Sequence, residues 1–191
     1  ANSATAVAVA SDITLTFNEA VRLINNSALD DSNVDALITL KEDNSSGADI
    51  AFNATINGGK TVITINPNSN LSSTQVVYVA IGATVEDASN NAINAANVSF
   101  TAADVSAPTM AITSAEVSDG GSSNDSTLAM TFTSSEATSN FVVGDISVSG
   151  GALSSFNATS TTVYTATFTP SGDGAKTIDV AGGAFTDSSS N

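Results

Sequence analysis

Short runs in which apolar and polar residues alternate recur along the whole chain. Ile13, Leu15 and Phe17 alternate with polar residues, and an alternation with a period of two predicts a half-buried β-strand. Further strand-like runs lie at 37–40, 62–65, 76–81, 110–112, 128–132, 146–148, 163–168 and 178–180. Turn signals such as Asn57-Gly58-Gly59 stand between them, and Thr and Val favour strands. The pattern therefore predicts an all-β protein.

Four landmarks occur twice, in the same order, in the two halves of the sequence. The first copies are ITLTFNEAV (13–21), FNAT (52–55), TVITINP (61–67) and VAIGATVEDASNN (79–91). The second copies are LAMTFTSSEAT (128–138), FNAT (156–159), TVYTATFTP (162–170) and VAGGAFTDSSSN (180–191). Such self-similarity indicates two homologous units. Pro108 cannot donate to a strand ladder and indicates a short linker, so we expect units at 1–105 and 106–191.

Each unit contains about six or seven short strands, which is typical of an immunoglobulin-like sandwich. The fold expected is therefore all-β, with two tandem Ig-like Greek-key β-sandwiches. The first strand of the first unit looks incomplete. The second unit has no strand after its acidic loop, where the first unit has AINAANVSFTA (92–102). We expect either a window from a longer array or neighbouring copies that complete the sheets by strand addition.

Specific stretches resemble a known family. ASDITLTFNEAV (10–21) followed by VEDASNNAI (85–93) resembles the bacterial Ig-like domain of S-layer-associated proteins and large repeat adhesins. The stretches 131–156 and 164–191 resemble a related repeat of giant secreted adhesins. The resemblance implies an extracellular or cell-surface location on a bacterium, a structural or adhesive role, and calcium binding in the loops.

Charge and missing residue types narrow the function. Nineteen acidic residues and four basic ones give a net charge of −15, which repels nucleic acid and anionic membrane surfaces. The chain has no Cys, His or Trp, so disulfides, ordinary zinc sites and Cys or His catalysis are excluded. No apolar stretch reaches the roughly 18 residues of a membrane span. No signal peptide is visible, so any signal or anchor of an exported protein would lie outside this window.

Acidic residues recur at two equivalent loop positions, and they are the candidate metal ligands. An acid follows the strand that ends in Thr-Phe, and another acid stands in the late Asp/Asn/Ser loop. Calcium prefers six to eight oxygen ligands of this kind. Asp104 in the linker is a further candidate, for an ion that stiffens an array. The alternative is that Asp and Asn only build turns. The candidate ligands are Glu19, Asp87, Asn91, Asp104, Glu136, Asp145 and Asp187.

A second calcium candidate lies at 31–42. Asp31, Asn33, Asp35 and Glu42 match positions 1, 3, 5 and 12 of an EF-hand loop. Ala36 stands where such loops have glycine, and residues 37–40 read as a strand, so this is the weaker candidate.

No catalytic motif appears, and the few aromatic residues give little for holding a sugar, so we do not expect an enzyme. The leading hypothesis is a calcium-rigidified structural or adhesive spacer of a large extracellular repeat protein. Its partners would be neighbouring Ig-like repeats or identical subunits. The alternatives are a filament subunit completed by strand exchange and a module that binds a surface glycan or protein.

Overall fold

The computed structural model describes residues 3–191, and the chain divides into two compact units, Ala1–Asp104 and Val105–Asn191. This division falls one residue before the boundary expected from the sequence. Strands dominate both units, and the helical turns among the described residues are η1 (Asp35–Leu37) and η2 (Val143–Asp145). Within residues 3–191, no helix has the length and apolar character needed to cross a membrane. The predicted all-β class is confirmed.

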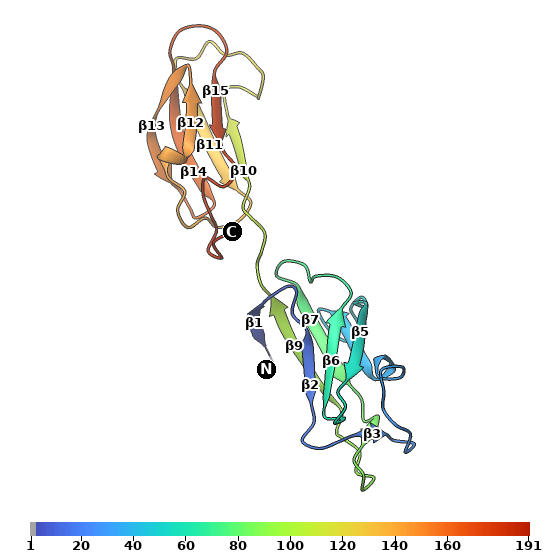
Figure 1. Cartoon of the computed structure of the whole chain (residues 1–191). Coiled ribbons are helices and arrows are strands. Elements are labelled where there is room, and N and C mark those ends of the chain that lie inside the picture. Colours follow the sequence, from blue (N-terminus) through green and yellow to red (C-terminus); the bar gives the residue numbers. More distant parts are fainter. Residues whose placement is uncertain (1–2) are drawn as a thin grey trace. The chain divides into compact units, whose positions relative to one another are not determined.

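The first unit is built from two sheets and a small ribbon (Figure 1). The sheet orders are β1-β9-β7-β4 and β2-β6-β5, and the ribbon is β3-β8. All pairs are antiparallel except β1 with β9, which run parallel. The strands are β1 (Ala4–Val7), β2 (Ile13–Thr16), β3 (Arg22–Leu23), β4 (Ile38–Glu42), β5 (Phe52–Ile56), β6 (Val62–Pro67), β7 (Val76–Ile81), β8 (Val85–Glu86) and β9 (Ala96–Ala102).

Alternate residues of these strands form the first core. Ile63 and Ile65 of β6 are fully buried, and so are Val77 and Val79 of β7. Phe100 of β9 belongs to the same cluster of buried residues. Because the side chains of a strand alternate between its faces, the alternation seen in the sequence places one apolar row on the inside of each sheet.

The second unit has one larger and one smaller sheet (Figure 1). The sheet orders are β10-β11-β14-β13 and β12-β15, and all pairs are antiparallel. The strands are β10 (Met110–Ser114), β11 (Leu128–Ser134), β12 (Ile146–Ser149), β13 (Gly151–Ala158), β14 (Val163–Pro170) and β15 (Thr177–Val180).

The second core is more aromatic than the first. The ring of Phe141 lies 4.9 Å from that of Tyr164, 5.1 Å from that of Phe185 and 5.9 Å from that of Phe156, measured between centroids. These three contacts are edge-to-face, the arrangement that aromatic quadrupoles favour. Phe141 therefore anchors the segment that carries Phe185, which lies next to the acidic loop 186–191.

The two units share one plan, as the sequence repeat predicted. The sheet β2-β6-β5 corresponds to β11-β14-β13, and the pair β4-β7 corresponds to β12-β15. The repeated FNAT stretch falls on β5 and β13, each of which pairs with the strand that follows it. The units differ at the first strand, because β1 pairs with β9 whereas β10 pairs with β11. Among the described residues, the second unit has no counterpart of β9.

Candidate metal site

The loop 186–191 is a tight turn organised by one carboxylate. The side chain of Asp187 accepts hydrogen bonds from the backbone amides of Ser189 at 2.7 Å and Asn191 at 3.1 Å, and from the Asn191 side-chain amide at 3.3 Å. Asp side chains commonly close turns by bonding to the backbone two residues on. Asp187 is nevertheless 2% exposed, so its charge is held away from bulk water.

This turn is attached to the loop that follows β11. Thr138 and Asp187 form a β-bridge, and the backbone amide of Ser139 donates to the carbonyl of Thr186 at 2.9 Å. The Ser139 hydroxyl donates to the carbonyl of Asp187 at 2.9 Å. These bonds hold the two loops together, and Glu136 lies in the first of them.

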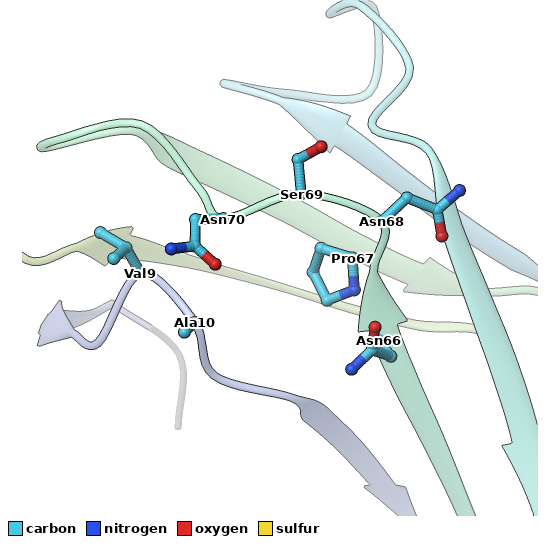
Figure 2. A pocket seen from close by; sticks show the side chains of 7 residues that line it. All are labelled: Val9, Ala10, Asn66, Pro67, Asn68, Ser69 and Asn70. Carbon is cyan, nitrogen blue, oxygen red and sulfur yellow. The ribbon is translucent and has the colours of Figure 1, made fainter.

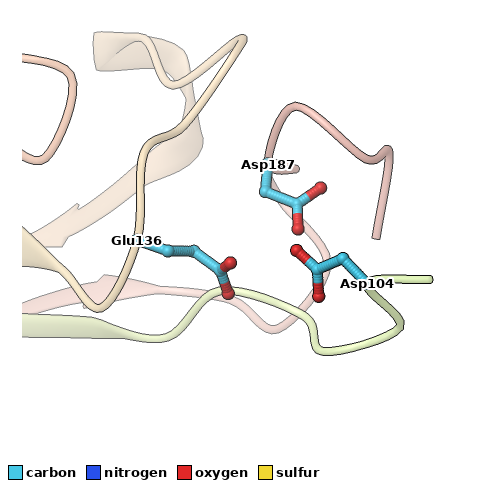
Figure 3. Close-up of side chains that lie close together, drawn as sticks. All are labelled: Asp104, Glu136 and Asp187. Atoms are coloured by element: carbon cyan, nitrogen blue, oxygen red, sulfur yellow. The ribbon is translucent and has the colours of Figure 1, made fainter. Parts of the chain in front are cut away.

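Three carboxylates converge at these loops. One oxygen each of Asp104, Glu136 and Asp187 lies within 4.8 Å of the other two (Figure 3). Asp104 is the residue immediately before the second unit, and its carboxylate also accepts a hydrogen bond from the Ser73 hydroxyl at 2.7 Å. At such separations two like charges repel by about 1 to 4 kcal/mol, depending on the local dielectric. The cluster would therefore be stabilised by a bound cation.

The donor set fits a hard divalent ion. All three groups offer oxygen, and calcium binds oxygen ligands at about 2.3 to 2.6 Å, so ligands on opposite sides of one ion lie about 4.8 Å apart. The measured spread of the three oxygens falls within that span. Asp104, Glu136 and Asp187 can hold a metal ion, and three of the seven predicted ligands are thus brought together.

The corresponding loop of the first unit forms the same turn. Asp87 accepts hydrogen bonds from the amides of Ser89 at 2.7 Å and Asn91 at 2.8 Å, and from the Asn91 side-chain amide at 2.7 Å. These bonds, those of Asn91 first, together with the charge of Arg22, hold the pKa of Asp87 below its ordinary value. Glu19 is exposed, and neither it nor Asp87 belongs to the three-carboxylate cluster.

An arginine supplies the positive charge beside this first loop. Arg22 Nε donates to the Glu86 carboxylate at 3.1 Å, and a terminal nitrogen of Arg22 donates to the Asn90 side chain at 3.0 Å. Glu86 is 4% exposed. The sequence analysis did not identify this pair. The available signal was that Glu86 and Arg22 have no charged counterparts at Thr186 and Ser139 of the second copy.

The remaining candidates from the sequence have structural partners. Asp145 accepts from the backbone amide of Val142 at 2.8 Å and so closes the turn η2. In the EF-hand-like stretch, Asp31 and Asp35 accept from the amides of Ile56 and Ala54 on β5. Glu42, the twelfth position, lies in strand β4. The stretch 31–42 therefore supports an edge of the sheet in place of a calcium loop.

A shallow hollow on the first unit is lined mainly by small polar residues (Figure 2). Its volume is about 160 Å³, below the roughly 300 Å³ from which small-molecule sites begin. No aromatic side chain lines it, so it lacks the stacking surface typical of a glycan site. Its lining residues are Val9, Ala10, Asn66, Pro67, Asn68, Ser69 and Asn70.

Comparison with known families assigns both units. Residues 1–102 match one model of the bacterial Ig-like domain, and residues 104–191, which include all three clustered acids, match another. No curated protein matches the chain significantly. Both matched domains are non-catalytic. The repeated strand plan, the paired acidic turns and the two matches agree, and the chain belongs to the bacterial Ig-like domain family, of which it carries two tandem members.

Proposed function

We propose that this chain is a structural spacer of a large extracellular repeat protein on the bacterial surface, and that calcium rigidifies it. Bacterial Ig-like domains are typical of surface and secreted proteins, in which they occur as repeats. The high negative charge and the absence of Cys and His accord with a mechanical role. Neighbouring Ig-like repeats are the proposed partners.

The observation that carries the calcium part is the convergence of Asp104, Glu136 and Asp187 within 4.8 Å. Asp104 lies in the segment that leads into the second unit. An ion bound to all three groups would hold this segment against the loops at 135–139 and 186–191. Fixing the backbone of one residue removes about 1 to 2 kcal/mol of conformational entropy, so the ion would restrict the segment measurably.

Thermal unfolding of the whole chain tests the proposal. Calorimetry in EDTA is compared with calorimetry in millimolar calcium, and magnesium at the same concentration controls for ionic strength. Calcium at a hundred times its Kd would stabilise the folded state by about 2.7 kcal/mol and raise the Tm of the second unit. Identical melting in EDTA and in calcium would contradict the calcium part and leave the spacer role to be tested by other means.

A further inference from the structure

Strand β15 has a partner on one edge only. In the first unit, the corresponding strand β7 pairs with β4 on one side and with β9 on the other. β15 pairs with β12, and within residues 3–191 no strand pairs with its other edge. The backbone amides and carbonyls along that edge are therefore available to another strand.

The core beside this edge is less enclosed than its counterpart. The pairings of Ile38 with Ile81 and of Ile146 with Val180 place Val180 at the position of Ile81, and Ile178 at that of Val79. Val79 and Ile81 are buried, whereas Ile178 and Val180 pack against the second core but remain half-exposed.

The first unit shows what covers this position. Strand β9 places Val98, Phe100 and Ala102 over the core, and Phe100 and Ala102 are buried. These residues alternate with polar Asn97, Ser99 and Thr101. A strand with the same alternation would pair its backbone with β15 and cover Ile178 and Val180 with one apolar row.

Charge narrows the occupant further. The same register places Asp179 at the position of Ala80, whose partner in β9 is Asn97. Asp179 is exposed, and the stretch 105–191 contains eight acidic residues and one basic residue. A strand with a neutral or basic residue opposite Asp179 is therefore favoured over an acidic one, because opposite charges across a strand pair stabilise it.

We propose that the free edge of β15 binds an extended segment of a partner polypeptide, antiparallel to β15, with apolar residues at alternate positions and a neutral or basic residue opposite Asp179. Main-chain hydrogen bonds would supply the affinity, and the alternating side chains would supply the specificity. The proposal is independent of the metal site, because it rests on strand pairing and on core burial.

Hydrogen exchange of the whole chain with a synthetic peptide tests this proposal. The peptide has the sequence of residues 94–103, NAANVSFTAA, which includes β9. At ten times its Kd it should slow amide exchange in 177–180 about tenfold, since protection follows the bound fraction. Exchange in β7 serves as the internal reference and should not change, because β7 is already paired on both edges.

Two variant peptides control for sequence. Val98→Asp puts a charge opposite Ile178 and should abolish protection, whereas Asn97→Lys should bind about two- to fivefold more tightly and lose this gain in high salt. Unchanged exchange with millimolar peptide, or equal protection by the Val98→Asp peptide, would overturn the proposal. Slow exchange without peptide in a chain that sediments as a dimer would overturn it too, since a second copy would then occupy the edge.

Discussion

The guanidinium of Arg22 donates to the carboxylate of Glu86 at 3.1 Å, and this ion pair lies beside the acidic turn of the first unit. The second unit has a hydroxyl pair there, Ser139 with Thr186 at 3.2 Å. The first acidic loop thus has an internal cation, whereas the three clustered carboxylates adjoin the second loop. The units share a turn but differ in how its charge is balanced.

Removal of the Arg22 side chain should destabilise the first unit. Arg22→Ser leaves the buried Glu86 carboxylate without its cation, and we expect a loss of about 2 to 3 kcal/mol, reduced from that of a fully buried pair because Arg22 is partly exposed. The double variant Arg22→Ser, Glu86→Thr copies the second unit and should recover most of this loss. Urea unfolding checks both variants. A double variant as unstable as the single one would contradict the ion-pair interpretation.

The two acidic turns provide a matched pair for the metal proposal. Asp187→Asn keeps the shape of the turn but removes one carboxylate of the cluster, so the calcium-dependent rise in Tm should disappear. Asp87→Asn alters the equivalent turn of the first unit and should leave the calcium effect intact. Calorimetry with and without calcium measures both. Equal loss of the calcium response in both variants would point to general charge neutralisation.

The titration of Asp87 should be displaced toward acid. Hydrogen bonds from Asn91 lower its pKa in the folded state below the ordinary value of 3.8. A lowered folded-state pKa stabilises the fold above the unfolded value, so this stabilisation is present above about pH 4 and is lost as the pH falls below it. A pH titration of the carboxyl carbon signal by NMR measures the midpoint. A midpoint at or above 3.8 would contradict the expected effect of the turn.

Ser134 is the buried residue, among those described, whose hydroxyl has no hydrogen-bond partner. A buried polar group without a partner costs about 1 to 3 kcal/mol, so Ser134→Ala should stabilise the second unit by about 1 kcal/mol. The neighbouring Ser135 hydroxyl accepts from the Thr109 amide, and Ser135→Ala should be destabilising by about 0.5 to 1 kcal/mol. Urea unfolding of the two variants gives opposite signs if this assignment is correct.

Phe141 connects the second core to the metal loop through Phe185. Phe141→Ala should destabilise the second unit by about 3 to 5 kcal/mol, because it leaves a large cavity. Phe141→Leu retains most of the volume and should cost roughly 1 to 2 kcal/mol through lost aromatic contacts. Calcium titration of the Phe141→Leu variant by calorimetry should show weaker binding. Unchanged calcium affinity would show that the loop is positioned without Phe141.

Much of the fold follows from local patterns. The alternating runs at 62–65, 76–81 and 163–168 became β6, β7 and β14, because one buried row on each sheet requires a period of two. The ribbon β3-β8 was not predicted, since each of its strands has two residues and shows no periodicity. The different pairing of β1 and β10 was not predicted either, because an edge strand of this kind can join either sheet.

The sequence by itself determined the all-β class, the two homologous units and the recurrence of Asp87 and Asp187 in equivalent turns, because these depend on local periodicity and turn chemistry. Only the tertiary structure decided which acids meet. Asp104, Glu136 and Asp187 are far apart in the chain, and they converge because Ser139 bonds one loop to the other. Glu19 and Asp145 carry the same charge, but they are not in the cluster. Ligand type is written in the residues, whereas proximity depends on long-range pairing.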